Sequence, residues 1–208
     1  MSNIFLYGER ELSYLSERDG SLAAAIKKYG FIERMVFSDF FTAFVNTVAA
    51  QQISSKALES VWGKLCALLP EMTAENVLEK DDEALRSCGL SVRKISWIKG
   101  GAEKIKSGKL DTEELSSLPD DELCARLCTL GGIGVWSAEM LMIFALGRKD
   151  VLSFGDFGIN RGLCVIHGLA PDEKLTKAEF AQYKALYSPF GTIASFYLWA
   201  ASANEQAK

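Results

Sequence analysis

The chain has 208 residues, of which 49% are hydrophobic, and a formal net charge of −4 at pH 7. This length accommodates one large domain or two small lobes, and the hydrophobic content excludes a disordered chain. The acidic balance disfavours a protein that coats nucleic acid through bulk charge, but it does not exclude local basic patches.

The cysteine pattern and the lengths of the apolar runs indicate the cellular compartment. Five cysteines and one histidine occur without a CxxC pair, which argues against zinc and iron–sulfur sites, so we expect no required cofactor. An odd cysteine count suits a reducing compartment. The longest apolar run, residues 140–146, is shorter than the roughly 20 residues that span a bilayer, and no signal-like segment is evident. We expect a monomer in a bacterial-type cytoplasm, without a membrane partner.

Helical periodicity recurs along the chain, whereas alternating strand patterns hardly occur. The predicted fold class is therefore all-α. Taken in chain order, the apolar stripes, acidic or proline-containing starts and glycine stops predict helices over residues 40–48, 57–68, 83–88, 92–106, 119–130, 135–146, 160–167, 177–187 and 191–201.

Residues 127–139, with the sequence LCTLGGIGVWSAE, form the most informative segment. Three glycines in four positions between two apolar-periodic segments predict a tight hairpin that joins two helices. Gly132 and Gly134 would let the backbone turn and approach a ligand without a Cβ clash. The helix that begins at Val135 would present unpaired N–H groups to an anion such as a nucleic-acid phosphate. A bare GxG is weak evidence, because glycines also end helices for structural reasons.

The longer pattern L-x-x-L-x-G-I-G-x-W-[ST]-A, with Asp156 downstream, is more specific. It resembles the helix-hairpin-helix DNA glycosylase superfamily, and within it the 3-methyladenine DNA glycosylase II branch. Further similar segments lie at residues 49–54, 85–94, 149–159 and 189–199, so the resemblance covers residues 40 to 199. By this resemblance we expect a short form, without the β-rich N-terminal domain of the longer bacterial enzymes.

The resemblance implies a two-lobed helical protein with double-stranded DNA bound across a cleft. Residues 36–148 would form the central lobe with the hairpin, and residues 1–35 with 149–208 the second lobe with the catalytic aspartate. A damaged nucleotide would be flipped into the cleft, because its glycosidic bond is inaccessible inside the stacked duplex. Such a protein would act on the nucleoid.

Asp156 is the candidate catalytic residue. Breaking an N-glycosidic bond creates positive charge on the sugar, which a nearby carboxylate stabilises while it orients water. The plainer interpretation is a helix N-cap, and the two roles are compatible. Trp136 stands where bifunctional relatives carry a Schiff-base lysine, so the resemblance implies a monofunctional enzyme without strand cleavage.

The resemblance also implies a substrate pocket of Trp136, Met140, Phe157 and Trp199, whose aromatic faces would attract an electron-poor base by about 0.5–2 kcal/mol. Ordinary core packing is the alternative for these residues. Met140 stands where the best-known relative has an aromatic residue.

Further DNA contacts are assigned to polar and basic residues outside this pocket. Gln51 and Gln52 are candidates to fill the gap left by the flipped base, with a solvated helix end as the alternative. Arg93 and Lys94 are candidates for phosphate contacts. By resemblance, the main-chain carbonyls of Cys128, Leu130 and Ile133 would hold a structural Na⁺ or K⁺.

These observations favour a glycosylase that removes alkylated purines of the 3-methyladenine type in base-excision repair. Two alternatives stay open. One keeps the fold and changes the substrate to an oxidised or deaminated base, and the other is a hairpin module that binds DNA without chemistry.

Overall fold

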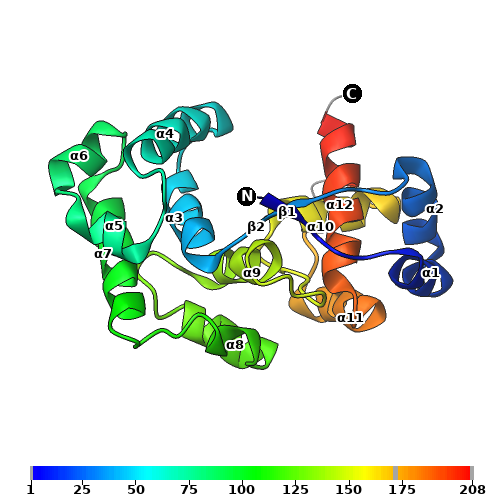
Figure 1. Ribbon diagram of the computed structural model, residues 1–208. Coiled ribbons are helices and arrows are strands. Elements are labelled where there is room, and N and C mark those ends of the chain that lie inside the picture. Colours follow the sequence, from blue (N-terminus) through cyan, green and yellow to red (C-terminus); the bar gives the residue numbers. More distant parts are fainter. Residues whose placement is uncertain (1, 171–172, 207–208) are drawn as a thin grey trace. The chain divides into compact units, whose positions relative to one another are not determined.

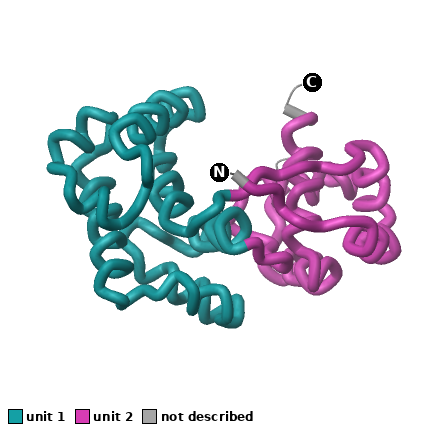
Figure 2. Tube along the Cα trace, viewed as in Figure 1, with its two compact units in different colours: residues 1, 37–146 teal, residues 2–36, 147–208 magenta. Residues whose placement is uncertain are grey.

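The computed structural model describes residues 2–170 and 173–206. The described chain holds twelve α-helices, one 3₁₀ turn and a two-stranded sheet, so the all-α class is confirmed (Figure 1). The chain divides into two compact units (Figure 2). Unit 1 comprises residues 37–146, and unit 2 comprises residues 2–36 together with those from 147 onward. The resemblance implies a central lobe of residues 36–148, whereas the compact unit 1 comprises residues 37–146.

Unit 1 is built around α3 (Phe40–Ala50), which packs against α4, α7 and α9. Asp39 begins this helix, because its carboxylate accepts the Thr42 N–H at 2.7 Å. The helix buries apolar side chains on most of its circumference, including Phe44 and Val48. The other elements of unit 1 are α4 (Ser55–Leu68), α5 (Ala74–Glu79), α6 (Asp82–Ser87), α7 (Val92–Lys106), the 3₁₀ turn η1 (Glu114–Ser116), α8 (Asp120–Leu127) and α9 (Val135–Phe144).

Unit 2 is built around α12 (Gly191–Gln206), whose residues 193–198 are buried without exception. Its other elements are β1 (Ser2–Ile4), α1 (Glu9–Arg18), α2 (Gly20–Tyr29), α10 (Phe157–Ile166) and α11 (Lys177–Tyr187). Strand β2 (Met35–Phe37) crosses the boundary, because its last residue is counted in unit 1. Helix α10 approaches α12 closely because Gly162 has no side chain: a Cβ there would lie 2.2 Å from the Leu198 carbonyl oxygen. This close contact brings the start of α10 to the indole of Trp199, where the site lies.

The helices predicted from apolar periodicity are present, with ends displaced by a few residues. The hairpin helices end at Leu127 and Phe144 rather than at residues 130 and 146, and α10 begins at Phe157 rather than at residue 160. Helices α1, α2 and α5 were not predicted. Helix α1 is mostly charged and polar and buries only Glu11 and Leu15, so its apolar stripe is too sparse to detect.

The helices of the described chain are too short or too polar to cross a bilayer.

Candidate functional site

The hairpin between α8 and α9 is shaped by its glycines and by Trp97. Gly132 has a φ of 79°, in the left-handed region that favours glycine. The Trp97 indole lies directly beneath the turn, because a Cβ on Gly131 or Gly132 would come within 2.6 or 2.4 Å of its ring atoms. Any larger residue at these two positions would displace the tryptophan, so the turn sits on an aromatic platform provided by α7.

Helix α9 begins at the exposed end of this hairpin. Its N-cap is Gly134, which provides no side-chain cap, and a Cβ built there meets no atom within 4 Å. Val135 and Trp136 follow with 61% and 46% of their surface exposed. The positive end of the helix dipole therefore faces open space, an arrangement suited to binding an anion.

Gln51 and Gln52, which follow the last residue of α3, have different environments. The Gln51 amide is anchored, because its Nε2 donates to the Gly132 carbonyl at 2.8 Å. Gln52 is exposed and has a φ of 57°, a conformation that non-glycine residues seldom adopt. The sequence could not separate these two residues, whereas the structure leaves Gln52 as the one that projects to solvent.

Arg93 and Lys94 also differ. The Arg93 guanidinium lies 4.7 Å from the centre of the Trp97 ring, on the exposed side of α7. The Lys94 ammonium instead donates to the main-chain carbonyls of Ala49 at 2.8 Å and Gln51 at 2.7 Å. Burial lowers the pKa of this ammonium. Of the two predicted phosphate contacts, only Arg93 lies open at the surface, since Lys94 is occupied by the chain itself.

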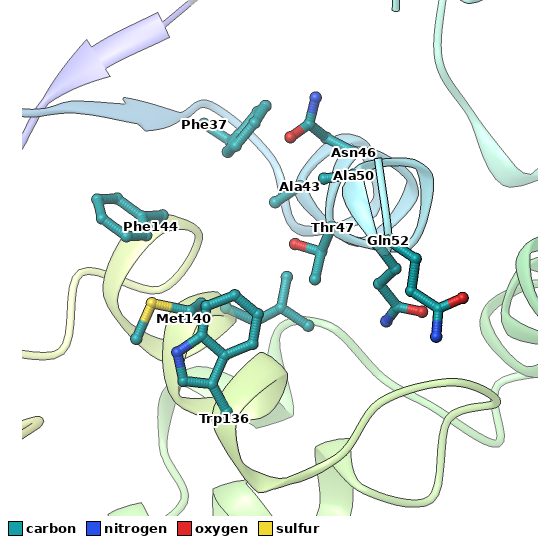
Figure 3. A pocket seen from close by; sticks show the side chains of 11 residues that line it. Phe37, Ala43, Asn46, Thr47, Ala50, Gln52, Trp136, Met140 and Phe144 are labelled. Carbon is teal, nitrogen blue, oxygen red and sulfur yellow. The ribbon is translucent and has the colours of Figure 1, made fainter. Parts of the chain in front are cut away.

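A pocket of about 370 Å³ lies between α3 and α9 in unit 1 (Figure 3). Trp136, Met140 and Phe144 line it from one face of α9, because they are spaced four residues apart. The side chain of Thr47 projects from α3 toward Met140 and Trp136 (Figure 3). The structure thus brings the predicted Trp136 and Met140 together with Gln51 and Gln52.

Sequence analysis did not identify the other seven lining residues of this pocket, which are Phe37, Ala43, Asn46, Thr47, Ala50, Leu141 and Phe144. The signal for Asn46 and Thr47 was available, because these two adjacent polar residues lie in the middle of a helix that is otherwise apolar apart from Thr42. Apolar pockets with few polar groups are typical of small-molecule binding sites.

Asp156 lies in unit 2 as the N-cap of α10. Its Oδ1 accepts two hydrogen bonds, from the Ile159 main-chain N–H at 2.8 Å and from the Trp199 indole Nε1–H at 2.9 Å. The residue is 7% exposed. Asn160 holds the loop that carries Asp156, because its Nδ2 donates to the carbonyls of Phe154 and Asp156, both at 2.8 Å. These hydrogen bonds hold the carboxylate in one orientation.

Trp199 and Phe157, the other predicted pocket residues, are placed differently from each other. The Trp199 indole stacks on Phe196 at 6.2 Å and reaches Asp156 because Gly158 leaves room: a Cβ there would lie 2.8 Å from the indole. Phe157 is 69% exposed. Asp156, Phe157 and Arg161 line a second pocket of about 560 Å³ within unit 2. Arg161 was not predicted, and its Nε is buried without a hydrogen-bond partner in the described structure.

The main-chain carbonyls proposed for a cation lie in the hairpin turn. The Leu130 oxygen accepts the Ile133 N–H at 3.1 Å, and the neighbouring Thr129 oxygen accepts the Lys104 ammonium at 2.6 Å. Across residues 2–170 and 173–206, no group of three His, Cys, Asp or Glu side chains could hold a metal. Neutral carbonyl oxygens suit an alkali-metal ion rather than a transition metal.

Comparisons with known proteins agree with the sequence resemblance. The chain is 34% identical to DNA-3-methyladenine glycosylase 1 of Schizosaccharomyces pombe over 93% of this chain and 86% of that protein. Its fold matches the crystal structure of a DNA-3-methyladenine glycosidase from Bacillus halodurans with a TM-score of 0.85 and 31% identity, over 99% of this chain and 95% of that one. It also matches S. pombe 3-methyladenine DNA glycosylase (Mag1) in complex with abasic DNA, with a TM-score of 0.81 and 32% identity, over 94% and 97% of the two chains.

The family model described as HhH-GPD superfamily base excision DNA repair protein matches residues 45–185, which include the hairpin, Asp156 and the end of α3. The resemblance drawn from the hairpin motif is thereby confirmed, and this chain belongs to the HhH-GPD superfamily of base-excision DNA repair proteins.

Proposed function

We propose that this chain is a monofunctional DNA glycosylase that removes alkylated purines of the 3-methyladenine type from double-stranded DNA. Its similarity to proteins named DNA-3-methyladenine glycosylase over nearly its whole length supports this function. The single observation that carries it within the molecule is Asp156, a buried carboxylate whose Oδ1 is held by Trp199 and the N-terminus of α10.

Asp156 would act on the flipped nucleoside. As the bond between the sugar C1′ and the purine nitrogen breaks, its electrons pass to the base and positive charge develops on the sugar. The carboxylate stabilises that charge and orients a water molecule, whose oxygen bonds to C1′ while a proton is released. An alkylated purine already carries positive charge and leaves as a neutral base, so this chemistry does not require a second acid.

Trp136 supports the monofunctional assignment. Strand cleavage by bifunctional enzymes proceeds through an amine that forms a Schiff base with the sugar. An indole lacks such a nucleophilic amine. We therefore expect the sugar–phosphate strand to stay intact after base removal.

The exposed end of unit 1 supports DNA binding. The open N-terminus of α9, with Gly132, Gly134 and Val135, would bind a backbone phosphate, and Arg93 would contact another. Gln52 would enter the space vacated by the flipped base, and the pocket of Trp136 and Met140 would receive an apolar or electron-poor group. Phe157 would offer a further exposed ring beside Asp156.

The proposed enzyme needs no cofactor. The carbonyls of Cys128, Leu130 and Ile133 would hold a Na⁺ or K⁺ that bridges the hairpin and a phosphate, and the neutral oxygen donors fit such an ion. We place its action on chromosomal DNA in a bacterial-type cytoplasm, as a monomer.

Base-release profiling tests the proposal. Purified protein is incubated with methylated duplex DNA, and the released bases and strand lengths are measured with and without alkali. The expected result is free methylpurine without treatment, and strand breaks only after alkali. Preferential release of an oxidised or deaminated base would reject the alkylpurine assignment, and absence of any release would favour a DNA-binding module.

A further inference from the structure

The C-terminal end of α3 is closed by a lysine from another helix. The last carbonyls of a helix lack partners within it, and the negative end of the dipole favours a cation there. Lys94, in the first turn of α7, satisfies the carbonyls of Ala49 and Gln51 with one ammonium group. Burial lowers its pKa, as expected for a charge removed from solvent. This ammonium is oriented toward the main chain, away from a ligand role.

The C-terminal end of α3 is also connected to the hairpin. Gln51 accepts Lys94 through its main-chain oxygen and donates through its side chain to the Gly132 carbonyl at 2.8 Å. One helical turn after Lys94, Trp97 supports Gly131 and Gly132 from below. Helix α7 therefore holds both the end of α3 and the hairpin turn, and Gln51 connects these two loops directly.

Gln52 is the residue immediately after Gln51. It is the one non-glycine residue with a positive φ in the described chain, at 57°, and its side chain is exposed. Such a backbone conformation persists when the surrounding structure imposes it. The hydrogen bonds at Gln51 supply that constraint, because they fix the residue immediately before Gln52.

We propose that Lys94 is a positioning residue: together with Gln51 it fixes Gln52 relative to the phosphate-binding hairpin. This inference rests on the proposed function, in which Gln52 enters the duplex. A side chain that unstacks a base pair must meet the duplex at a defined distance from the bound phosphate. The Lys94–Gln51–Gly132 connection sets that distance before DNA arrives.

The competing interpretation is a direct phosphate contact by Lys94, and salt dependence separates the two. Each phosphate contact contributes about 0.9 to the slope of log K against log salt concentration. For Lys94→Met we expect an unchanged slope for binding to lesion-containing duplex, together with a roughly ten- to hundred-fold slower single-turnover base release. The matched control is Lys99→Met on the same helix, which removes an ammonium paired with Asp82 and leaves release at the parent rate.

A double-mutant cycle tests the route through Gln52. If Lys94 acts by placing Gln52, the Lys94→Met change slows release much less in a Gln52→Ala background than in the parent. Gln51→Met breaks the link to Gly132 without leaving a charge unpaired, and we expect it to slow release in the same direction. If thermal melting shows that Lys94→Met does not fold, the Gln51→Met variant tests the positioning role in its place.

Three results would overturn the positioning role: a slope lowered by about 0.9 in Lys94→Met, parent-level release in folded Lys94→Met or Gln51→Met, or the full Lys94→Met effect persisting without Gln52. Failure of the proposed function gives a different result, because the parent protein itself would release no base. The salt slope of Lys94→Met would still distinguish a phosphate contact from an internal one.

Discussion

Two helix N-termini in this protein differ in their capping: one has no side-chain cap, and the other is capped by a carboxylate. Helix α9 in unit 1 begins at Gly134, which provides no capping side chain and has open space around it. Helix α10 in unit 2 begins at Asp156, whose carboxylate occupies its own helix end and also accepts the Trp199 indole N–H. Both ends carry the same partial positive charge.

The difference shows that a single N-cap residue determines whether a helix N-terminus can bind an external anion. An uncapped N-terminus is available to an anion from outside, such as a DNA phosphate, whereas a capped one holds an anion that belongs to the chain. In this protein the first arrangement would bind the substrate backbone, and the second would fix the carboxylate that meets the sugar. The following predictions test this division, from the largest expected effect to the smallest.

Replacing Asp156 with Asn should abolish most activity without unfolding the protein. Asn is as good an N-cap as Asp, so the helix end stays capped while the negative charge is lost. We expect single-turnover base release to fall roughly 10²- to 10³-fold, with an unchanged melting temperature. Asp39→Asn, the same change at the N-cap of α3, is the matched control and should retain activity. Release at the parent rate by Asp156→Asn would reassign catalysis.

Replacing Trp199 with Phe should remove the indole N–H that holds Asp156 while keeping an aromatic ring. A hydrogen bond to a charged group contributes about 1.5–3 kcal/mol, so we expect kcat to fall roughly ten- to hundred-fold with little change in DNA affinity. Tyr197→Phe on the same helix removes a hydrogen bond to the Gly30 carbonyl and serves as control. A loss of affinity with kcat unchanged would show that Trp199 contacts the base instead.

Replacing Gly134 with Asp should convert the open helix end into a closed one. The backbone at this position is extended, with φ −94° and ψ 179°, and a Cβ meets no neighbour, so the side chain fits. We expect a gain of only a few tenths of a kcal/mol in folding stability from the new cap, because glycine is itself an acceptable N-cap residue. DNA affinity should fall about ten-fold, because the carboxylate occupies the site and repels phosphate. Gly134→Ala, which adds no charge, should weaken binding less, and equal losses would argue against a phosphate at this helix end.

Replacing Glu11 with Gln should reveal that Glu11 makes a small, pH-dependent contribution to the folding stability of unit 2. Lys149 donates to the Glu11 carboxylate at 2.8 Å, and this hydrogen bond lowers the pKa of Glu11. Because the folded pKa lies below the unfolded one, the stabilisation is complete above about pH 4.5 and disappears as the pH falls through the folded value. Denaturant melts at pH 7 should show a loss of up to about 1 kcal/mol that vanishes in acid. A difference that persists at low pH would exclude the ion pair as its cause.

Much of the local structure could be predicted from neighbouring residues. Glycine spacing predicted the turn between α8 and α9, and the position of Asp156 before an apolar helix predicted its N-cap, because both features depend on backbone conformations within a few residues. The polar helix α1 was not predicted, since its burial depends on other helices rather than on its own pattern.

The roles of the individual site residues depended on partners far away in the chain. Gln51 meets Gly132 across 81 positions, Lys94 meets Ala49 across 45, and Trp199 meets Asp156 across 43. By itself the sequence determined the helical class and the N-caps of α9 and α10, because these follow from short-range periodicity and capping. Its hairpin motif also carried the resemblance to the superfamily. Only the tertiary structure decided that Gln52 rather than Gln51 projects outward, that Lys94 faces inward, and that Trp199 holds the carboxylate, because packing selects which distant polar groups pair when water is excluded.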